Sequence, residues 1–373
     1  MIYLDNAATT PLDDEVLEAM LPYMRENFGN PQSQHAAGRA AANALTSARD
    51  RIAEIFGCGA DEVYFVSGGT EAGNTALKGV CLSRGRGHLV LSAIEHPALL
   101  ESAKDLKDGF EITYVKPDKN GIINPSDVAN ALREDTVFCA VMAANNEVGT
   151  IQPYEEIGEI CKKRGVFYYT DCVQSAGVLP FNANCCSSLG VSAHKFYGPR
   201  SVGAIYIKKG SKISRLISGG RQERGFRGGT VNVAGAVGCA VALERAVNNS
   251  DKNNKKIAAL RDTFVKKVLA EIEGTHLNGN LQRRVPSNAN ISFEGCDGEN
   301  LLFLLDMKGI CVSTGSACSA GAVSPSHVLT AMGLSESRVK SAVRFSFGKY
   351  NTQEEVNLTV DTLKEAVNKI RNK

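Results

Sequence analysis

The chain has 373 residues, of which 43% are hydrophobic and 22% charged, a composition typical of a globular protein. Its 42 lysines and arginines are nearly balanced by 40 aspartates and glutamates, so charge gives no reason to expect nucleic acid or an anionic membrane as a partner. The length favours two lobes, because single hydrophobic cores stop growing near ~250–300 residues.

Signals for export and for metal binding are missing from the sequence. The segment from Met1 to Asn6 has neither the basic nor the apolar part of a secretory signal, and no apolar run reaches the ~20 residues of a membrane span. We therefore expect a cytoplasmic protein whose 11 cysteines are mostly reduced thiols. No C-x-x-C pair occurs, and the adjacent Cys185 and Cys186 are poorly spaced for chelating one ion, so no metal site is expected.

From residue 51 to residue 207, short β-branched runs alternate with helical segments. The expected strands cover residues 63–66, 88–91, 111–115, 137–142, 166–169, 189–191 and 203–207. Several are almost continuously apolar, as strands covered on both faces should be. One intervening helix is expected to open at Pro153 and to stop at Gly165. This alternation predicts an α/β domain with a mostly parallel sheet.

The pattern changes after about residue 248. The polar stretch 248–256 predicts an exposed break, and a long helix should follow with Leu260, Phe264, Val268 and Ile272 on its apolar face. Short strands are expected at 289–293, 310–313 and 343–347, and a capping box at 352–355 opens a closing helix. We predict a large domain of residues 13–250 and a smaller α+β domain formed by residues 1–12 together with 251–373.

Three motifs carry chemistry, and the first contains Lys195. The motif Ser192-Ala193-His194-Lys195-Phe196-Tyr197 follows the expected strand 189–191, which puts Lys195 at the carboxyl end of a strand, where α/β proteins bind ligands. Partial desolvation there would lower the pKa of the amine and make it a Schiff-base nucleophile. A surface lysine after a strand explains this motif equally well when it is taken alone.

The second motif contains Asp171 and the third is a glycine-rich turn. Asp171 comes just after the expected strand 166–169. Its carboxylate could pair with a protonated pyridine nitrogen there, which would make that ring a better electron sink. When the motif is taken alone, an N-cap of the next helix is the simpler interpretation of Asp171. In Ser67-Gly68-Gly69-Thr70, a strand runs into two glycines just before a helix, which favours binding of one phosphate. Neither the Walker spacing nor G-x-G-x-x-G is present, and a tight turn with Thr70 as N-cap is the alternative.

The glycine-rich turn for a phosphate, the carboxylate of Asp171 and the amine of Lys195 are together typical of fold-type I pyridoxal-phosphate enzymes. The chain resembles the class V aminotransferase group and, within it, the NifS/IscS-like cysteine desulfurases, from Tyr3-Leu4-Asp5-Asn6-Ala7-Ala8-Thr9-Thr10-Pro11 to Ala342-Val343-Arg344-Phe345-Ser346. The resemblance implies an α/β fold with a large, mostly parallel-sheet domain and a smaller α+β C-terminal domain, with pyridoxal 5'-phosphate as cofactor.

The resemblance also implies roles for individual residues. The expected cofactor-binding residues are Gly69, Thr70, His96, Asn146, Asp171, Gln174, Ser192, His194 and Lys195, joined by Thr230, which would reach the phosphate of the neighbouring subunit of a homodimer. His96 would stack on the pyridine ring and could move protons together with Lys195, although a lone histidine after a strand is more often structural. Arg344 should hold the substrate carboxylate bidentately, with Asn30 nearby.

The loop around Cys318 decides which reaction is expected. Small residues flank Cys318 from residue 312 to residue 321, which favours an exposed loop that can present a nucleophile. An incidental surface thiol would look the same, but the segment 313–319 resembles the family's S-x-G-S-A-C-S loop. The resemblance implies that L-cysteine gives L-alanine and a persulfide on Cys318, which then passes sulfur to an acceptor, such as iron–sulfur cluster assembly or thiolation. The other ten cysteines are expected to be structural.

Alternatives remain at this stage. A selenocysteine lyase or another class V aminotransferase would share most of these motifs, although an aminotransferase needs no nucleophilic thiol. A Ser-x-x-Lys acylase at residues 192–195 lacks its partner motifs, and intact Lys195 and Asp171 disfavour a catalytically silent sulfur carrier. Relatives often carry glycine at the position of Ala193. Relatives that dock on an iron–sulfur scaffold often have a longer C-terminal segment than the 29 residues that here follow Arg344. The sequence therefore does not identify the protein that accepts the sulfur. It also gives no explanation for the adjacent Cys185 and Cys186.

Overall fold

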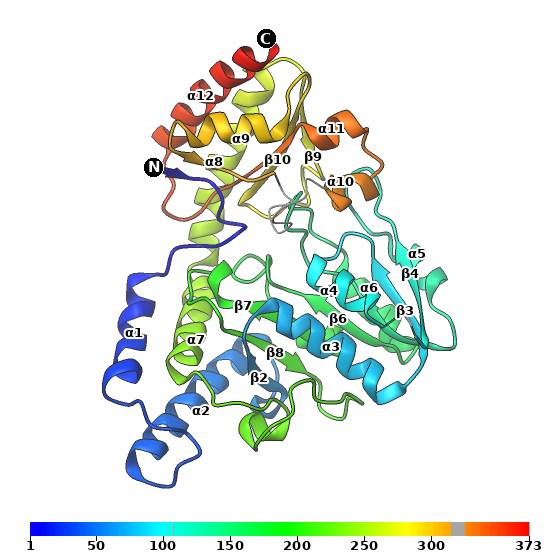
Figure 1. The fold of residues 1–373 in the computed structure, drawn as a ribbon, viewed down its shortest axis with the longest axis vertical. Coiled ribbons are helices and arrows are strands. Elements are labelled where there is room, and N and C mark those ends of the chain that lie inside the picture. Colours follow the sequence, from blue (N-terminus) through cyan, green and yellow to red (C-terminus); the bar gives the residue numbers. More distant parts are fainter. Residues whose placement is uncertain (107, 315–324, 373) are drawn as a thin grey trace.

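The computed structural model describes residues 1–106, 108–314 and 325–372. A seven-stranded sheet forms the centre of the larger lobe, in the order β2-β8-β7-β6-β5-β3-β4 (Figure 1). Its strands are β2 (Val63–Val66), β3 (Gly87–Ser92), β4 (Phe110–Val115), β5 (Thr136–Ala140), β6 (Phe167–Asp171), β7 (Ser188–Ser192) and β8 (Gly203–Ile207). Strands β4, β3, β5, β6 and β7 run parallel, and β8 is antiparallel to both of its neighbours. The predicted mostly parallel sheet is confirmed, with strand ends displaced by no more than two residues.

Both faces of this sheet are covered by helices. Alternate residues of one strand point to opposite faces, so Leu89 and Leu91 pack in one core and Val90 in another. The helices of the first face are α3 (Gly69–Arg84) and α4 (Pro97–Lys104). The second face packs against α2 (Ala36–Phe56), α5 (Pro125–Ala131), α6 (Tyr154–Lys163) and α7 (Val233–Asn248), with α1 (Asp14–Arg25) alongside α7. The near-continuous apolar runs of the strands follow from this double cover.

The smaller lobe has its own core. It contains the antiparallel sheet β12-β10-β9 and the short parallel pair β1-β11. Its elements are β1 (Ile2–Tyr3), α8 (Ser250–Glu271), β9 (Thr275–Asn278), β10 (Asn288–Phe293), α9 (Gly298–Asp306), β11 (Ile310–Cys311), α10 (His327–Ala331), α11 (Glu336–Lys340), β12 (Ala342–Ser346) and α12 (Gln353–Arg371). Ile2 and Leu4 join this core although they begin the chain. Helices α10 and α11 differ, because Val328, Leu329 and Val339 pack in the core of the larger lobe. We propose the division into residues 13–250 and residues 1–12 with 251–373 on the basis of the other elements, which share the core of the smaller lobe.

The polar stretch 248–256 is not the break that its composition predicts. Helix α8 begins at Ser250, so only Asn249 separates it from α7. Most side chains of the stretch are exposed or half-buried, and the first one that is buried is that of Ile257. A run of polar residues on the solvent side of a helix is indistinguishable in composition from a loop, which is why the prediction was wrong there. The capping box that opens α12 is present, with Thr352 and Glu355 as its two partners.

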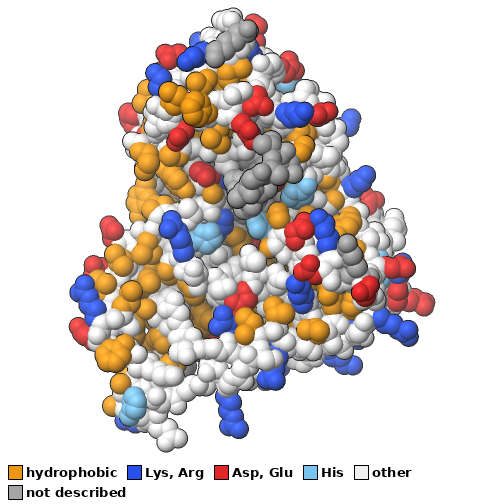
Figure 2. Space-filling model, viewed as in Figure 1, with side chains coloured by type: hydrophobic (Ala, Val, Ile, Leu, Met, Phe, Trp, Pro, Cys, Tyr) orange, Lys and Arg blue, Asp and Glu red, His pale blue; other side chains and the backbone are white. Residues whose placement is uncertain are grey.

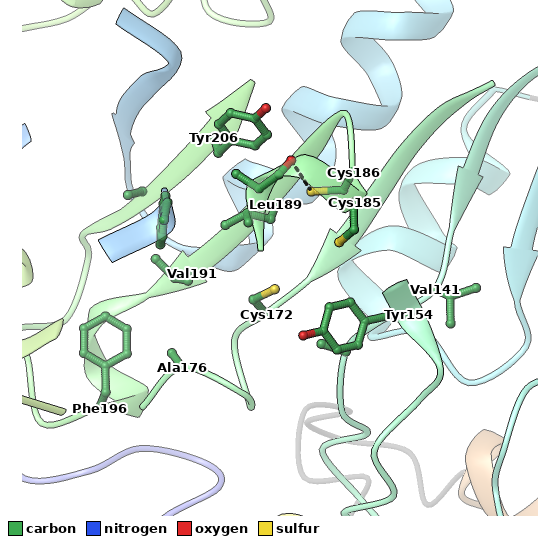
Figure 3. Close-up of a cluster of buried hydrophobic side chains, with 14 of the residues drawn as sticks. Val141, Tyr154, Cys172, Ala176, Cys185, Cys186, Leu189, Val191, Phe196 and Tyr206 are labelled. Atoms are coloured by element: carbon green, nitrogen blue, oxygen red, sulfur yellow. Dashed lines mark hydrogen bonds between the residues drawn. The ribbon is translucent and has the colours of Figure 1, made fainter. Parts of the chain in front are cut away.

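The adjacent cysteines of the sequence lie in the core of the large lobe. Cys185 and Cys186 are 4% and 5% exposed and pack with Cys172, Tyr154 and Leu189 (Figure 3). Both thiols donate to main-chain carbonyls, Cys185 to Asn182 at 3.0 Å and Cys186 to Ala183 at 3.8 Å. They therefore fill apolar space under the sheet. Among the described residues, no group of three or more potential ligands is arranged for a metal ion, and no helix is long and apolar enough to cross a membrane.

Candidate active site

A cavity opens at the carboxyl ends of the parallel strands, beneath the smaller lobe. It is lined by Ala7, Ala8, Thr9, Ser67, Gly68, Gly69, Thr70, His96, Met142, Asn146, Asp171, Val173, Gln174, Ser192, His194, Lys195, Arg200, Ser201 and Arg344. In this way the structure brings together ten of the residues predicted from the sequence. Figure 2 shows histidine side chains gathered at mid-height on this face of the molecule, where the smaller lobe meets the larger one.

Lys195 lies on a short 3-10 turn, η3 (Ala193–Lys195), directly after β7. Its Nζ donates to the carbonyl oxygens of Ala7 and Ala8, both at 2.7 Å. The amide of Gln174 donates to the same Ala7 carbonyl at 3.0 Å. The segment that follows the first strand of the small lobe therefore forms one wall of the cavity and meets the lysine there.

Asp171 is the last residue of β6 and the only carboxylate among the described residues that line the cavity. Its Oδ1 accepts from the main-chain N–H of Val173 at 2.8 Å, but a turn follows it rather than a helix, so it is not a helix N-cap. Desolvation raises the pKa of its carboxyl group to about 6, against the opposing effects of the Val173 N–H and the charge of Lys195. A cation beside this carboxyl group would therefore stabilise its ionised form.

The glycine-rich turn after β2 is a cradle that side chains would fill. A Cβ atom on Gly69 would come within 2.7 Å of Val173, and one on Gly68, whose φ is +146°, within 3.0 Å of the Ser192 hydroxyl. Helix α3 begins at Gly69, so its first N–H groups lie at the cradle. Thr70 belongs to the first turn of the helix, and Gly68 is the N-cap. Close approach of an anion to a helix N-terminus is what this geometry permits.

Two histidines of the cavity are held neutral. Desolvation and the charge of Lys195 lower the pKa of both His96 and His194 to about 4, in each case with burial as the larger cause. His96 caps helix α4, and its Nδ1 accepts from the N–H of Ala98 at 3.1 Å. The single proton of neutral His96 is consequently on Nε2. His194 contacts the hydroxyl of Thr9 through Nδ1 at 3.1 Å.

Arg344 enters the cavity from β12 of the smaller lobe and is 3% exposed. It donates to Asp5 at 2.9 Å and to the main-chain oxygen of Asn146 at 3.1 Å, whereas its Nε finds no hydrogen-bond partner among the described residues. A buried guanidinium with one unmet N–H can still bind a further oxygen acceptor.

Two predicted residues lie outside this cavity. Asn30, in the loop between α1 and α2, and Thr230, before α7, are both exposed and do not line the cavity of their own chain. Gln32 and Gln222 join the two loops by a hydrogen bond of 2.9 Å between their side-chain amides. Cys318 lies outside the described residues. Sequence reasoning missed Arg200 and Ser201, which follow the lysine turn; Ser201 has a φ of +58°, and its only sequence signal is the preceding Gly198-Pro199 turn.

Comparison with known proteins places this geometry in a family. Residues 2–358 match the class V aminotransferases. The chain is 46% identical over 375 residues to a protein of Dictyoglomus turgidum named cysteine desulfurase IscS, covering 99% of this chain and 95% of that protein. A protein of the same name from Methanosarcina thermophila is 45% identical, with 100% and 93% covered. The chain belongs to the class V aminotransferase family.

Solved structures agree with this membership. A NifS-like protein superposes with a TM-score of 0.92 at 38% identity, covering 98% of this chain and 99% of that one. A class V aminotransferase of this kind is a fold-type I enzyme that depends on pyridoxal 5'-phosphate. The predicted fold class and cofactor are thus confirmed.

The cavity of this class V enzyme fits pyridoxal phosphate in three respects. The Gly68 and Gly69 cradle leaves space and helix N–H groups for one phosphate. Asp171, half-buried at the end of β6, suits a protonated ring nitrogen. Lys195 is within the same cavity, as a Schiff-base lysine must be.

Proposed function

We propose that this protein is a cysteine desulfurase that removes sulfur from L-cysteine and releases L-alanine. The names of the relatives support this substrate, since both proteins described above are called cysteine desulfurase and match almost the whole chain. The loop sequence Ser313-Thr314-Gly315-Ser316-Ala317-Cys318-Ser319 supports the chemistry, because it supplies the nucleophilic thiol that an aminotransferase does not need. We propose Cys318, Lys195 and His96 as the catalytic residues.

Bound pyridoxal phosphate would supply the electron sink that lets the α-proton of cysteine leave and return. Lys195 would hold the cofactor and would then move this proton. His96 offers one N–H on Nε2 and stays uncharged near neutral pH, which suits a ring stacked beside the cofactor. The thiolate of Cys318 would attack the substrate sulfur, so that an S–S bond forms as the C–S bond breaks. The electron pair of the broken bond stays with the β-carbon, which takes up a proton and becomes the methyl group of alanine, and the persulfide remains on Cys318 until an acceptor takes its outer sulfur.

Four further sets of residues would position the two ligands. Gly69, Thr70, Ser192 and His194 hold the phosphate, Asp171 the ring nitrogen, and Asn146 with Gln174 the ring hydroxyl. Arg344 binds the substrate carboxylate. Its hydrogen bonds to Asp5 and to the main-chain oxygen of Asn146 keep the guanidinium in place.

We propose that Thr230 and Asn30 act in the cavity of a second subunit. Both are exposed, both lie outside their own cavity, and the Gln32–Gln222 hydrogen bond joins their loops on one surface. Met24 at the end of α1 and Phe28 in the loop that follows are large apolar side chains that are 60% and 76% exposed. A homodimer that buries this surface would explain these observations together.

The decisive experiment measures both the absorbance of the bound cofactor and the products formed from L-cysteine. The purified protein should absorb as a pyridoxal-phosphate enzyme, and should release alanine and, under reductant, sulfide from L-cysteine. Lys195→Ala should lose the cofactor absorbance. Cys318→Ala should keep that absorbance and release no sulfide. Unchanged sulfide release by Cys318→Ala would contradict the desulfurase proposal and favour an aminotransferase or a lyase. Comparing cysteine with selenocysteine as substrates would separate the remaining alternative, a selenocysteine lyase.

A further inference from the structure

Glu95, the residue before His96, is a buried carboxyl group with an unusual set of partners. It is 1% exposed. Its Oε1 accepts from the hydroxyl of Ser92 and from the main-chain N–H of Met142, the latter at 2.8 Å. Its Oε2 is buried and has no hydrogen-bond partner among the described residues, and no ion pair of Glu95 occurs among them either.

A second buried glutamate shows what an ionised carboxylate requires in this protein. Glu223 is 5% exposed and receives both terminal nitrogens of Arg49, at 2.6 and 2.8 Å, together with the N–H of Phe65 at 2.8 Å. Both of its oxygens are thus satisfied, and its charge is paired. Among the described residues, Glu95 has no cationic partner and no donor to its second oxygen. A buried charge without a partner costs free energy.

The surroundings of Glu95 favour the protonated form. Burial is the largest cause that raises the pKa of Glu95, to about 8, and the negative charge of nearby Asp171 raises it further. The hydrogen bonds from Ser92 and Met142 act in the opposite direction but do not compensate. At neutral pH Glu95 is therefore a carboxylic acid, and the cavity keeps Asp171 as its charged acid.

Glu95 also connects the strands that carry the site. Ser92 ends β3, and Met142 follows β5 and lines the cavity. The next N–H along, that of Ala143, donates to the main-chain oxygen of Asp171 at 2.9 Å. The main-chain oxygen of Glu95 itself accepts from Nε2 of His327 at 3.0 Å. One side chain therefore ties together the ends of two strands, beside the residue that is to stack on the cofactor.

We propose that Glu95 is a positioning residue that works as a neutral acid, fixing the ends of β3 and β5 so that His96 and Asp171 face the cofactor. The inference rests on the proposed function for its cofactor, and it assigns no contact with substrate to Glu95. It explains why a glutamate is tolerated in a buried place without a cation. A charged Glu95 would place a second anion next to Asp171 and weaken the pairing of the ring nitrogen with a single carboxylate.

Glu95→Gln and Glu95→Ala distinguish this role from that of an ionised base. Glutamine keeps the acceptor oxygen and the volume and stays neutral. It should preserve the dissociation constant of pyridoxal phosphate, measured by absorbance titration of the apoprotein, and the pH profile of the bound cofactor's spectrum between pH 6 and 7. Alanine leaves the Ser92 and Met142 donors unsatisfied and should weaken cofactor binding by about 10- to 100-fold.

A tenfold loss of affinity in Glu95→Gln, or a shifted pH profile, would overturn the proposal, because it would show that the negative charge is needed. Equal affinity in Glu95→Ala would overturn it as well. Thermal unfolding of the apoproteins gives a test that needs no cofactor: the glutamine variant should gain stability over the wild type as the pH rises from 6 to 8, and a constant difference would contradict a neutral Glu95. Failure of the wild type to make alanine from cysteine would remove the proposed function and leave this unfolding test intact.

Discussion

Replacing Glu223 by alanine should destabilise the protein more than removal of any single exposed charge. Glu223 lies on the 3-10 segment η4 (Gln222–Gly225), where its own φ is +44° and that of Arg224 is +58°, a conformation that non-glycine residues adopt at a cost. Its carboxylate holds the segment against Arg49 of α2 and the N–H of Phe65 on β2. Breaking a buried pair from one side costs about 3–5 kcal/mol, because the other charge is left unpaired.

For a chain of 373 residues, a loss of that size corresponds to a fall in the melting temperature of about 4–6 °C. Differential scanning calorimetry of the apoprotein measures it. Asp105→Ala, which removes the exposed partner of Lys78, is a matched control and should change the melting temperature little. Arg49→Met combined with Glu223→Leu should recover much of the loss, since an apolar pair leaves no buried charge. A fall below about 1 °C in Glu223→Ala would refute the assignment of this pair as an anchor.

Three further changes test the site itself. Asp171→Asn removes the anion for the ring nitrogen and should weaken pyridoxal-phosphate binding by about tenfold or more, as read from absorbance titration. Arg344→Lys loses the planar fork and should raise the KM for cysteine by about tenfold with a smaller change in kcat, measured by alanine release. For His96, whose pKa falls from 6.5 to about 4 on folding, the unfolded chain binds the extra proton between these values. Stability is therefore lost as the pH falls from 6.5 towards 4, and His96→Gln should show a smaller loss across that window in thermal melts.

The strand-end motifs could be predicted from sequence because their signals are local. Lys195, Asp171 and the Gly68-Gly69 turn each follow an apolar run by one to four residues, and the carboxyl ends of parallel strands meet at one edge of a sheet. Arg344 and Asn30 were assigned only through resemblance, because their place depends on contacts between distant segments. The Asp5–Arg344 pair joins residues separated by 339 positions, and no local pattern indicates it.

Burial was the property that sequence could not supply. Nothing in the order Glu95-His96-Pro97 tells a solvated glutamate from one that is 1% exposed, and the same is true of Cys185 and Cys186. A different error occurred at 248–256, where exposure was predicted correctly but polar residues that face solvent from a helix were taken for a break between elements. For Glu95, Cys185 and Cys186 the deciding factor is which neighbours pack against the side chain, and this is set by tertiary contacts rather than by composition.

The charges of the cavity explain why one site can hold both an anionic cofactor and an amino acid. The cationic side chains that line it are Lys195, Arg200 and Arg344, and Asp171 is the single carboxylate among its described lining residues. His96 and His194 add no positive charge near neutral pH, because burial and Lys195 hold their pKa values low. The positive groups then act on the phosphate and the substrate carboxylate, while Asp171, with a neutral Glu95 behind it, is left for the ring nitrogen.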